Sequence, residues 1–527
     1  MRAISPPTMK HTMSKLEKSL LNVRLAKYKD IKDLVALSVS NYDDVAMDAK
    51  QIRGQISMFP EGQFVVEYNG QIVGHCATFI IKGNVALKPH TWEEITGYGF
   101  ASRHDPDGDY LYGMEVSVSK EFRGQRIGQR LYNARKTLCQ EFDLKGIVFG
   151  GRIPGYGKKH KKVTSAEEYV SLVQEKKFRD PVLGFQLSND FEVIGVLENY
   201  LPSDKESRGY AVHLLWRNPY THDVTKHSKS KQRGRLPDTV RVATVQFQVR
   251  KVTSEKQFEQ QLEYFIDVAS DYSADFVCFP EMVTLALLSM ENERLTPEKS
   301  VARITEYTTR YVEFMQQLAI SYNINIIGGS HPTRLHDGAI YNVCYVFLRD
   351  GSVHTQAKLH PTPNETYWWN IKGGDKLDAI ETDCGPIGVQ ICYDSEFPEP
   401  SRYLADQGAM ILFVPYCTDE RQGHLRVRYC CQARAIENQM YVVTAGVVGN
   451  LPDVENMDIH YAESGVFTPC DFPFARDGIA AECAANTEMI AFADLRLESL
   501  IMSRNTGTVQ NLKDRRFDLY NVAWKKN

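Results

Sequence analysis

The stretch Gly388-Val-Gln-Ile-Cys392-Tyr-Asp-Ser-Glu-Phe-Pro-Glu399 decides how the C-terminal half of this 527-residue chain is interpreted. Its apolar start predicts a buried strand over 387–392, and the spacing after it predicts a helix over 400–407. A cysteine at the end of such a strand is well displayed as a nucleophile, because the sheet holds its backbone and a nearby helix N-terminus favours the thiolate. Taken alone it indicates little, since the chain has eleven cysteines and buried structural cysteines are common.

Three charged residues add to this pattern. Glu281 closes the segment Phe279-Pro280-Glu281 after a predicted strand, and Lys358 closes a predicted hairpin of strands 341–347 and 353–359. Glu365 follows shortly after Lys358. A charged residue alone is normally a solvated surface group, but solvation is less expected where a charge ends an apolar run. Amide hydrolysis by a cysteine needs a base for the thiol proton and donors for the oxyanion, and these residue types supply both.

Taken together and in this order, these segments resemble the motifs of the nitrilase superfamily of carbon–nitrogen hydrolases. The segment Ala433-Arg-Ala-Ile-Glu-Asn438 is similar to another familiar part of that superfamily. The resemblance covers about 239–499 and implies an α-β-β-α sandwich. The alternation of apolar strands and amphipathic helices after Thr239 agrees with a layered α/β domain, and it includes one long predicted helix over 297–322.

The resemblance also implies roles for the residues. Cys392 would be the nucleophile and Glu281 the general base and acid, while Lys358 and the backbone amide of Tyr393 would stabilise the oxyanion. Glu365 would hold the lysine and orient the substrate. The sequence Cys392-Tyr393-Asp394 is similar to the amidase version of the motif, whereas true nitrilases usually have Cys-Trp-Glu. The aromatic run of residues 367–369, Tyr-Trp-Trp, is predicted to line an acyl pocket, or alternatively to belong to the core or to an oligomer interface.

The N-terminal half predicts a separate α+β domain. Two strands joined by an Asn69-Gly70 turn precede a strand over 111–118, a loop and a helix over 129–141. Backbone N–H groups at such a helix start bind pyrophosphate well, and glycine allows the ligand to come close. The segment 116–131 resembles the acetyl-coenzyme A signature of the GNAT N-acetyltransferases, although Arg126 stands where the family has its first glycine.

This second resemblance covers about 22–216 and implies acetyl-coenzyme A as co-substrate. The implied coenzyme-binding residues share one strand–loop–helix unit: Val116, Val118, Arg123, Gly124, Arg126 and Gly128. Glu115, just before them, is a candidate base for an attacking amine. The alternative for Glu115 is an ordinary outward-facing strand residue.

Composition and charge exclude some classes of protein. A net charge of −4 gives no global basic field for nucleic acid, and the longest apolar runs are too short to span a bilayer. The cysteines form no Cys-x-x-Cys pair, so we expect no metal site, reduced thiols and a cytoplasmic protein. The expected divisions are a disordered tail (1–21), a GNAT-like domain (22–216), a basic linker (217–238), a hydrolase domain (239–510) and a C-terminal tail (511–527).

The sequence therefore predicts a bifunctional enzyme. One half would hydrolyse a non-peptide amide and the other would transfer an acyl group from acetyl-coenzyme A to an amine. In the alternative interpretation the GNAT-like half senses or binds acyl-coenzyme A without catalysis. The expected partners are small-molecule amides and amines, with no nucleic acid and no membrane, and the resemblance implies a homo-oligomer.

Overall fold

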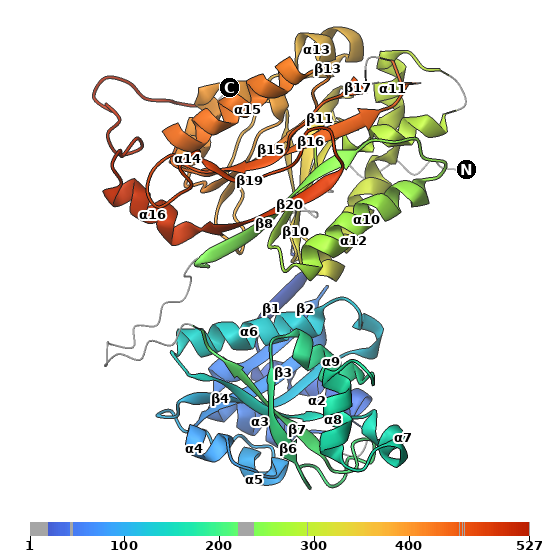
Figure 1. Cartoon of the computed structure of the whole chain (residues 1–527), viewed down its shortest axis with the longest axis vertical. Coiled ribbons are helices and arrows are strands. Elements are labelled where there is room, and N and C mark those ends of the chain that lie inside the picture. The colour runs from blue at the N-terminus through green and yellow to red at the C-terminus, as the bar shows by residue number, and fades with distance from the viewer. Residues whose placement is uncertain are drawn as a thin grey trace. The chain divides into compact units, whose positions relative to one another are not determined.

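The chain forms two compact units. The computed structural model describes residues 19–42, 46–219, 237–291, 294–452, 454–455, 457 and 459–525. One unit contains residues 20–234 and the other contains residues 235–527 (Figure 1). Most of the expected N-terminal tail (1–18) and most of the expected linker (220–236) lie outside the described residues.

The N-terminal unit is built on a seven-stranded sheet in the order β1-β2-β3-β4-β5-β7-β6. Its strands are β1 (Leu21–Leu25), β2 (Gln63–Tyr68), β3 (Gln71–Ile81), β4 (Tyr110–Val118), β5 (Gly146–Arg152), β6 (Glu192–Leu197) and β7 (Ala211–Arg217). Only β4 and β5 pair in parallel; the other neighbours are antiparallel. The predicted Asn69-Gly70 turn is confirmed: both residues have positive φ, as a two-residue hairpin turn requires.

Helices flank this sheet (Figure 1). They are α2 (Ile31–Asn41), α3 (Ala49–Met58), α4 (Gly83–Ala86), α5 (Trp92–Thr96), α6 (Ile127–Glu141), α7 (Tyr156–Lys159), α8 (Ala166–Gln174) and α9 (Pro181–Ser188). In α6, the buried positions Ile127, Leu131 and Leu138 recur at helical spacing, which explains why this segment is an amphipathic helix. The α+β domain predicted from the sequence is therefore confirmed.

The C-terminal unit contains a long sheet path in the order β12-β11-β10-β9-β8-β16-β15-β14. The strands of this path are β8 (Thr239–Gln248), β9 (Phe276–Cys278), β10 (Asn325–Arg334), β11 (Ile340–Phe347), β12 (Val353–Ala357), β14 (Ile387–Val389), β15 (Ile411–Tyr416) and β16 (Tyr441–Asn450). Five more pair beside it: β13 (Ile371–Lys372), β17 (Ile459–His460), β18 (Gly465–Phe467), β19 (Ile479–Glu482) and β20 (Met489–Arg496).

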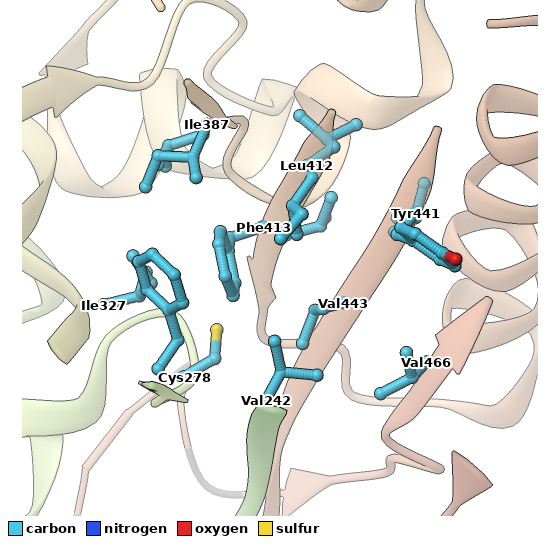
Figure 2. Close-up of a cluster of buried hydrophobic side chains, with 14 of the residues drawn as sticks. Val242, Cys278, Ile327, Ile387, Leu412, Phe413, Tyr441, Val443 and Val466 are labelled. Carbon is cyan, nitrogen blue, oxygen red and sulfur yellow. The ribbon is translucent and has the colours of Figure 1, made fainter. Parts of the chain in front are cut away.

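The sheet path divides between β8 and β16 into two halves that face each other: the first runs from β12 to β8 and the second from β16 to β14. β8 and β16 are paired at only two residue pairs, Phe247 with Val447 and Gln248 with Val448. Side chains from both halves, such as Cys278 and Phe413, meet in one buried cluster (Figure 2). In this cluster the rings of Phe276 and Phe413 lie 5.2 Å apart. These contacts make two stacked sheet layers.

Helices cover the outer faces of both layers. They are α10 (Glu255–Asp271), α11 (Pro297–Ile304), α12 (Thr308–Tyr322), α13 (Pro363–Trp369), α14 (Pro398–Asp406), α15 (Arg421–Glu437) and α16 (Leu497–Thr506). α10 and α12 pack on the first half through a second buried cluster, and α14 and α15 pack on the second half. The predicted α-β-β-α sandwich is confirmed.

One helix prediction was wrong. The expected continuous helix over 297–322 is interrupted by a 3-10 turn at Thr305–Tyr307. The Thr308 hydroxyl donates to the carbonyl of Thr305 and also contacts the ring of His331, and the Thr305 hydroxyl donates to Ala302. Hydroxyls that bind nearby backbone in this way compete with the regular helical ladder.

The segment after α16 contacts the body of its unit. Arg515 forms an ion pair with Asp406 of α14, and the ring of Trp524 stacks on Tyr403. Within the described ranges, no helix combines the length and the apolar character that crossing a bilayer would require.

Candidate active sites

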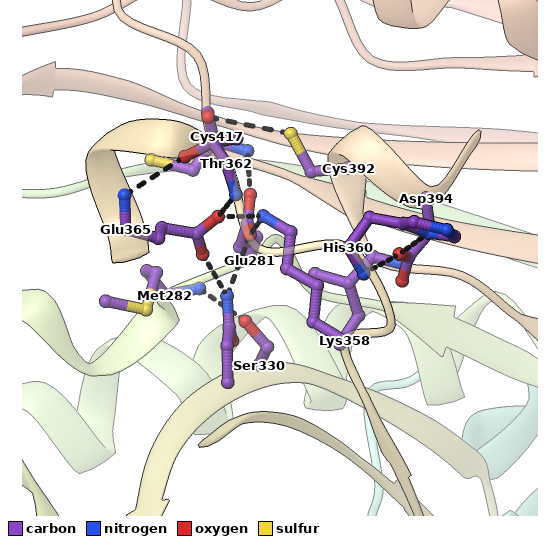
Figure 3. Close-up of polar contacts among 12 residues, drawn as sticks. Glu281, Met282, Ser330, Lys358, His360, Thr362, Glu365, Cys392, Asp394 and Cys417 are labelled. Carbon is purple, nitrogen blue, oxygen red and sulfur yellow. Dashed lines mark hydrogen bonds and ion pairs between the residues drawn. The ribbon is translucent and has the colours of Figure 1, made fainter. Parts of the chain in front are cut away.

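Four predicted site residues of the C-terminal unit lie together. Glu281 follows β9, Lys358 follows β12, Glu365 lies in α13, and Cys392 begins the short 3-10 helix that follows β14 (Figure 3). All four are buried, with exposed fractions between 1% and 6%. Buried charges are stable only when they are paired, so their mutual contacts decide what this cluster can do.

Lys358 is the centre of the cluster. Its Nζ donates to Oε1 of Glu281 at 2.8 Å and to Oε2 of Glu365 at 2.7 Å. Burial alone would lower the pKa of Lys358, but the two carboxylates outweigh it and raise the pKa well above its usual range. The lysine is therefore a fixed ammonium at neutral pH.

Glu281 has the character of a base. Its Oε2 accepts a hydrogen bond from the backbone N–H of Cys417 at 2.8 Å. Burial raises the pKa of Glu281, while Lys358 and a hydrogen bond from the Cys392 thiol act in the opposite direction. A carboxylate with a raised pKa takes up protons more readily than a surface glutamate does.

Cys392 is held in an unusual backbone conformation. Its φ is +48°, in the left-handed region that a residue with a side chain adopts only at a cost. The Ser395 hydroxyl donates to the Cys392 carbonyl at 2.7 Å, and Sγ of Cys392 lies 3.8 Å from the carbonyl of Cys417. Burial raises the pKa of the thiol well above its usual range, so Cys392 is a neutral thiol that needs a base.

Three side chains of this site were missed by sequence analysis. Asn342 of β11 donates through Nδ2 to Glu281 at 2.9 Å and to Glu365 at 3.1 Å. Thr362 caps α13: its hydroxyl accepts from the Glu365 N–H, and its own N–H donates to the Glu365 carboxylate. A polar Asn within the apolar run of β11 was the available signal for Asn342.

Asp394 is the third missed side chain. It is fully buried, and its carboxylate accepts from the backbone N–H groups of Leu359, His360 and Ile391. It also contacts Nδ1 of His360 at 2.9 Å. Asp394 thus ties the loop after Lys358 to the residue before Cys392, and its place in the Cys-Tyr-Asp motif was the sequence signal.

The aromatic residues after Glu365 differ in exposure. Tyr367 and Trp368 are 77% and 49% exposed and pack edge to face. Trp369 is partly buried against the second buried cluster, through which α10 and α12 pack on the sheet. Their predicted part in an acyl pocket stays a prediction.

In the N-terminal unit, the predicted coenzyme segment lies where two strands separate. β4 and β5 pair only at Leu111 and Tyr112, so within the described ranges β4 from Gly113 onward has no partner strand on that side. Val116 and Val118 belong to this part of β4, Arg123 and Gly124 to the loop after it, and Gly128 to the first turn of α6.

Arg126 adopts the conformation that its position demands. Its φ is +50° and that of Gly124 is +85°, so the loop turns through two left-handed residues before α6 begins. The departure from the family glycine at Arg126 therefore keeps the turn. Such a turn before a helix presents backbone N–H groups to an anion.

Side chains hold the unpaired part of β4. The carbonyls of Met114, Glu115 and Val116 accept hydrogen bonds from three side chains that are distant in the sequence: Trp92 Nε1 at 3.4 Å, buried Arg135 at 2.6 Å and the Tyr42 hydroxyl at 2.9 Å. Both carboxylate oxygens of Glu115 are buried, and burial raises the pKa of Glu115 to about 7. This arrangement favours Glu115 as a proton acceptor over the outward-facing alternative.

Comparison with known families agrees with this geometry. Residues 241–504 match the carbon–nitrogen hydrolase family, and residues 31–150 match the GNAT family of acetyltransferases. The chain belongs to the carbon–nitrogen hydrolase family. It joins this hydrolase domain to an N-terminal GNAT domain, as the sequence predicted.

Three relatives are informative. Over nearly its whole length this carbon–nitrogen hydrolase is 46% identical to a probable hydrolase, YhcX, of Bacillus subtilis, covering 98% of this chain and 99% of that one. The N-terminal part is 34% identical to the uncharacterized N-acetyltransferase YkwB of Bacillus subtilis, covering 38% of this chain and 90% of that one. The C-terminal part is 28% identical to omega-amidase NIT2 of Xenopus tropicalis, covering 54% and 99%.

Proposed function

We propose that the hydrolase domain cleaves the carbon–nitrogen bond of a small, non-peptide amide through Cys392. The observation that carries this proposal is the closed cluster of Glu281, Lys358 and Glu365 around a buried neutral thiol. A thiol with a raised pKa reacts only when a base removes its proton during attack, and Glu281 is the buried base beside it.

In the first half of the proposed reaction, Glu281 takes the thiol proton as Sγ of Cys392 attacks the amide carbon. The carbonyl oxygen becomes an oxyanion, which the Lys358 ammonium and the backbone N–H of Tyr393 stabilise. Preorganised donors of this kind contribute about a hundredfold or more to the rate. The C–N bond then breaks, the nitrogen leaves with the proton from Glu281, and a thioester remains on Cys392.

In the second half, Glu281 removes a proton from water, and the resulting oxygen nucleophile attacks the thioester carbon. The same oxyanion donors act again, the C–S bond breaks, and the thiolate regains its proton from Glu281. Glu365 is a positioning residue in this scheme, because its carboxylate accepts from Lys358 at 2.7 Å and fixes the ammonium.

An amide is proposed over a nitrile for two reasons. First, the motif Cys392-Tyr393-Asp394 is similar to the amidase version of the family motif, and its Asp394 accepts hydrogen bonds from three backbone N–H groups. The hydrolase domain is also similar to proteins named omega-amidase and deaminated glutathione amidase.

An amide library tests this proposal. Wild type, Cys392→Ala and Cys483→Ala are compared by release of ammonia or amine. Cys483 is the matched control because it is also buried but directly follows β19, where its backbone N–H donates to Ser464 rather than to a residue of the cluster. Turnover is expected in wild type and Cys483→Ala and lost in Cys392→Ala; turnover that survives in Cys392→Ala would refute the assignment.

For the GNAT domain we propose transfer of an acyl group from acetyl-coenzyme A to a small amine. The pyrophosphate would bind the backbone N–H groups of the loop from Arg123 to Gly128, and the thioester would lie along the unpaired part of β4 that includes Val116 and Val118. Glu115 would take the proton from the attacking amine. The buried, raised-pKa carboxyl of Glu115 favours catalysis over the alternative of a purely acyl-coenzyme A-sensing module.

Calorimetry tests the binding of acetyl-coenzyme A, and an assay of acetyl transfer to amines separates these two possibilities. Gly128→Glu is expected to abolish binding by placing a carboxylate beside the phosphates. Gly184→Glu in α9 is the control, because Gly184 is exposed and its added Cβ meets no atom within 4 Å. Gly128→Ala reports separately on crowding, since a Cβ at 128 would lie 3.1 Å from the ring of Phe185. Binding without acetyl transfer to any amine would favour the sensing module.

We also propose the domain limits 22–216 and 239–510, a cytoplasmic location, and a homo-oligomeric assembly. Limited proteolysis followed by mass spectrometry tests the limits, because cleavage concentrates in exposed segments between domains. Light scattering of the full chain tests the assembly, and a mass equal to one chain at micromolar concentration would refute it.

A further inference from the structure

Asn342 closes a ring of buried polar contacts in the hydrolase domain. Its side chain is fully buried on β11, and its Nδ2 donates to Oε1 of Glu281 and to Oε1 of Glu365. The same two carboxylates accept from Lys358. The backbone carbonyl of Asn342 accepts from the Lys358 N–H at 2.8 Å, so one residue orients all three ionisable partners.

The charges of this ring do not balance through Lys358 alone. Glu281 and Glu365 are two carboxylates beside a single ammonium, and neighbouring carboxylates resist being ionised together unless other donors stabilise both. The amide of Asn342 has two N–H donors and no charge, and each donor serves one carboxylate. A lysine or arginine in its place would lower the basicity of Glu281, whereas an apolar residue would let the two carboxyls share a proton.

We infer that Asn342 is a positioning residue that keeps Glu281 and Glu365 ionised together and thereby keeps Glu281 free to act as the base. This inference rests on the proposed hydrolase function. Stability alone does not explain the residue, because Oδ1 of Asn342 is buried with no hydrogen-bond partner among the described residues. A buried polar atom without a partner costs stability, so the favourable contacts of this side chain are those that it makes with the two carboxylates.

Other ionisable groups around Glu281 act on its proton as well. They come from each element packed against it: Lys358 after β12, Glu365 of α13, Cys392 after β14 and Cys417 after β15. His460 of β17 contacts the Cys417 thiol at 3.4 Å. Substitution at Asn342 changes none of these five residues themselves, so a change in the pH profile reports the lost N–H donors.

The decisive variant is Asn342→Asp, which keeps the shape of the side chain and replaces the two N–H donors by an acceptor. We expect kcat/KM at neutral pH to fall about a hundredfold, because the catalytic base is then misplaced and partly protonated. The acidic limb of the pH profile should move upward by at least one pH unit, because a third carboxylate opposes ionisation of Glu281. Asn342→Ala, which removes the donors without adding charge, should show a smaller shift in the same direction.

Asn325 is a matched control. It is also a buried asparagine of the same sheet, and its Nδ2 donates to the carboxylate of Asp383 at 3.0 Å. Asn325→Asp is expected to lower stability but to leave the acidic limb unchanged. The inference would be overturned if the acidic limb of the pH profile were unchanged in Asn342→Asp, or if it moved equally in Asn325→Asp.

A second readout needs no substrate. Alkylation of Cys392 by iodoacetamide, followed peptide by peptide in the full chain across pH, measures how readily the thiol loses its proton to the neighbouring base. The midpoint in Asn342→Asp should lie above that of wild type, and equal midpoints would overturn the inference. If no amide gives turnover that depends on Cys392, the proposed function fails, while the alkylation midpoints still decide the role of Asn342.

Discussion

Replacement of Lys358 by methionine would remove the ammonium at the centre of the buried cluster. Methionine has a similar length and is apolar, so the change leaves Glu281 and Glu365 without their ammonium while filling the same space. Both ion pairs, at 2.8 and 2.7 Å, are lost at once. Hydrolysis should disappear because the oxyanion loses its main charged donor.

The cost in stability can be worked out from the carboxylates. Removing one partner from a buried ion pair typically costs about 3–5 kcal/mol. The two unpaired carboxylates can limit this cost by binding one proton, which they share. At pH 7 protonating a glutamate with an ordinary pKa of about 4.3 costs about 4 kcal/mol, at about 1.4 kcal/mol for each pH unit. We therefore expect Lys358→Met to lower the free energy of unfolding by about 4 kcal/mol at pH 7.

The sign of the pH dependence follows. In Lys358→Met the shared proton raises a carboxyl pKa of the folded state above its unfolded value. Its contribution to stability is therefore present at low pH and is lost as pH rises. The destabilisation should fall from about 4 kcal/mol at pH 7 to about 1 kcal/mol at pH 5. Glu281→Gln, which leaves Lys358 paired with Glu365, should show a smaller and flatter loss.

Urea unfolding followed by hydrogen exchange of peptides measures this loss in the hydrolase domain alone. Peptides from β9 and β12 report on the cluster, and peptides from β3 report on the GNAT domain as an internal reference. A loss for Lys358→Met that is the same at pH 5 and pH 7, or that stays below about 1 kcal/mol at pH 7, would refute the reasoning.

Three further outcomes are expected. Arg434→Met should lower kcat about tenfold or more without unfolding the chain, because Arg434 Nε donates to the Ser395 carbonyl at 3.0 Å and holds the nucleophile loop; unchanged kinetics would count against this. In acetyl transfer, Arg135→Met should move the acidic limb upward, since the Arg135 charge lowers the pKa of Glu115; calorimetry with acetyl-coenzyme A checks that binding survives. Burial lowers the pKa of His331 to about 3 in the folded state, below its unfolded value, so the wild type loses stability as the pH falls from 7 to 5. His331→Gln has no group that titrates in this way, and its loss over the same interval should be smaller by about 2 kcal/mol. Thermal melts at both pH values measure the two losses, and equal losses would contradict the prediction.

The two domains and the candidate site residues could be predicted from the sequence because their signals are local. Glu281 and Cys392 each stand at the end of an apolar run and Lys358 near the end of a predicted hairpin strand, and a strand that ends in a turn leaves such residues at the rim of a sheet. The loop from Arg123 to Gly128 is similarly local, since the strand, turn and helix start are adjacent in the chain. Resemblance to known motifs then added the order in which these segments occur.

The break between α11 and α12 could not be predicted in this way. The helical pattern over 297–322 is continuous, and the hydroxyls of Thr305 and Thr308 are compatible with a helix. The interruption depends in part on His331 of β10, which contacts the Thr308 hydroxyl at 2.8 Å across 23 positions of the chain. A pattern within one segment carries no information on such a partner.

The sequence by itself determined the fold class, the residue types of the candidate site and the turn at Gly124. Only the tertiary structure decided that Asn342 bridges Glu281 and Glu365, from 61 and 23 positions away. It also decided that the backbone N–H of Cys417 reaches Glu281 from 136 positions away. Periodicity and motifs record which face of an element is buried, whereas the protonation of a buried carboxylate depends on every donor that folding brings within about 3 Å of it.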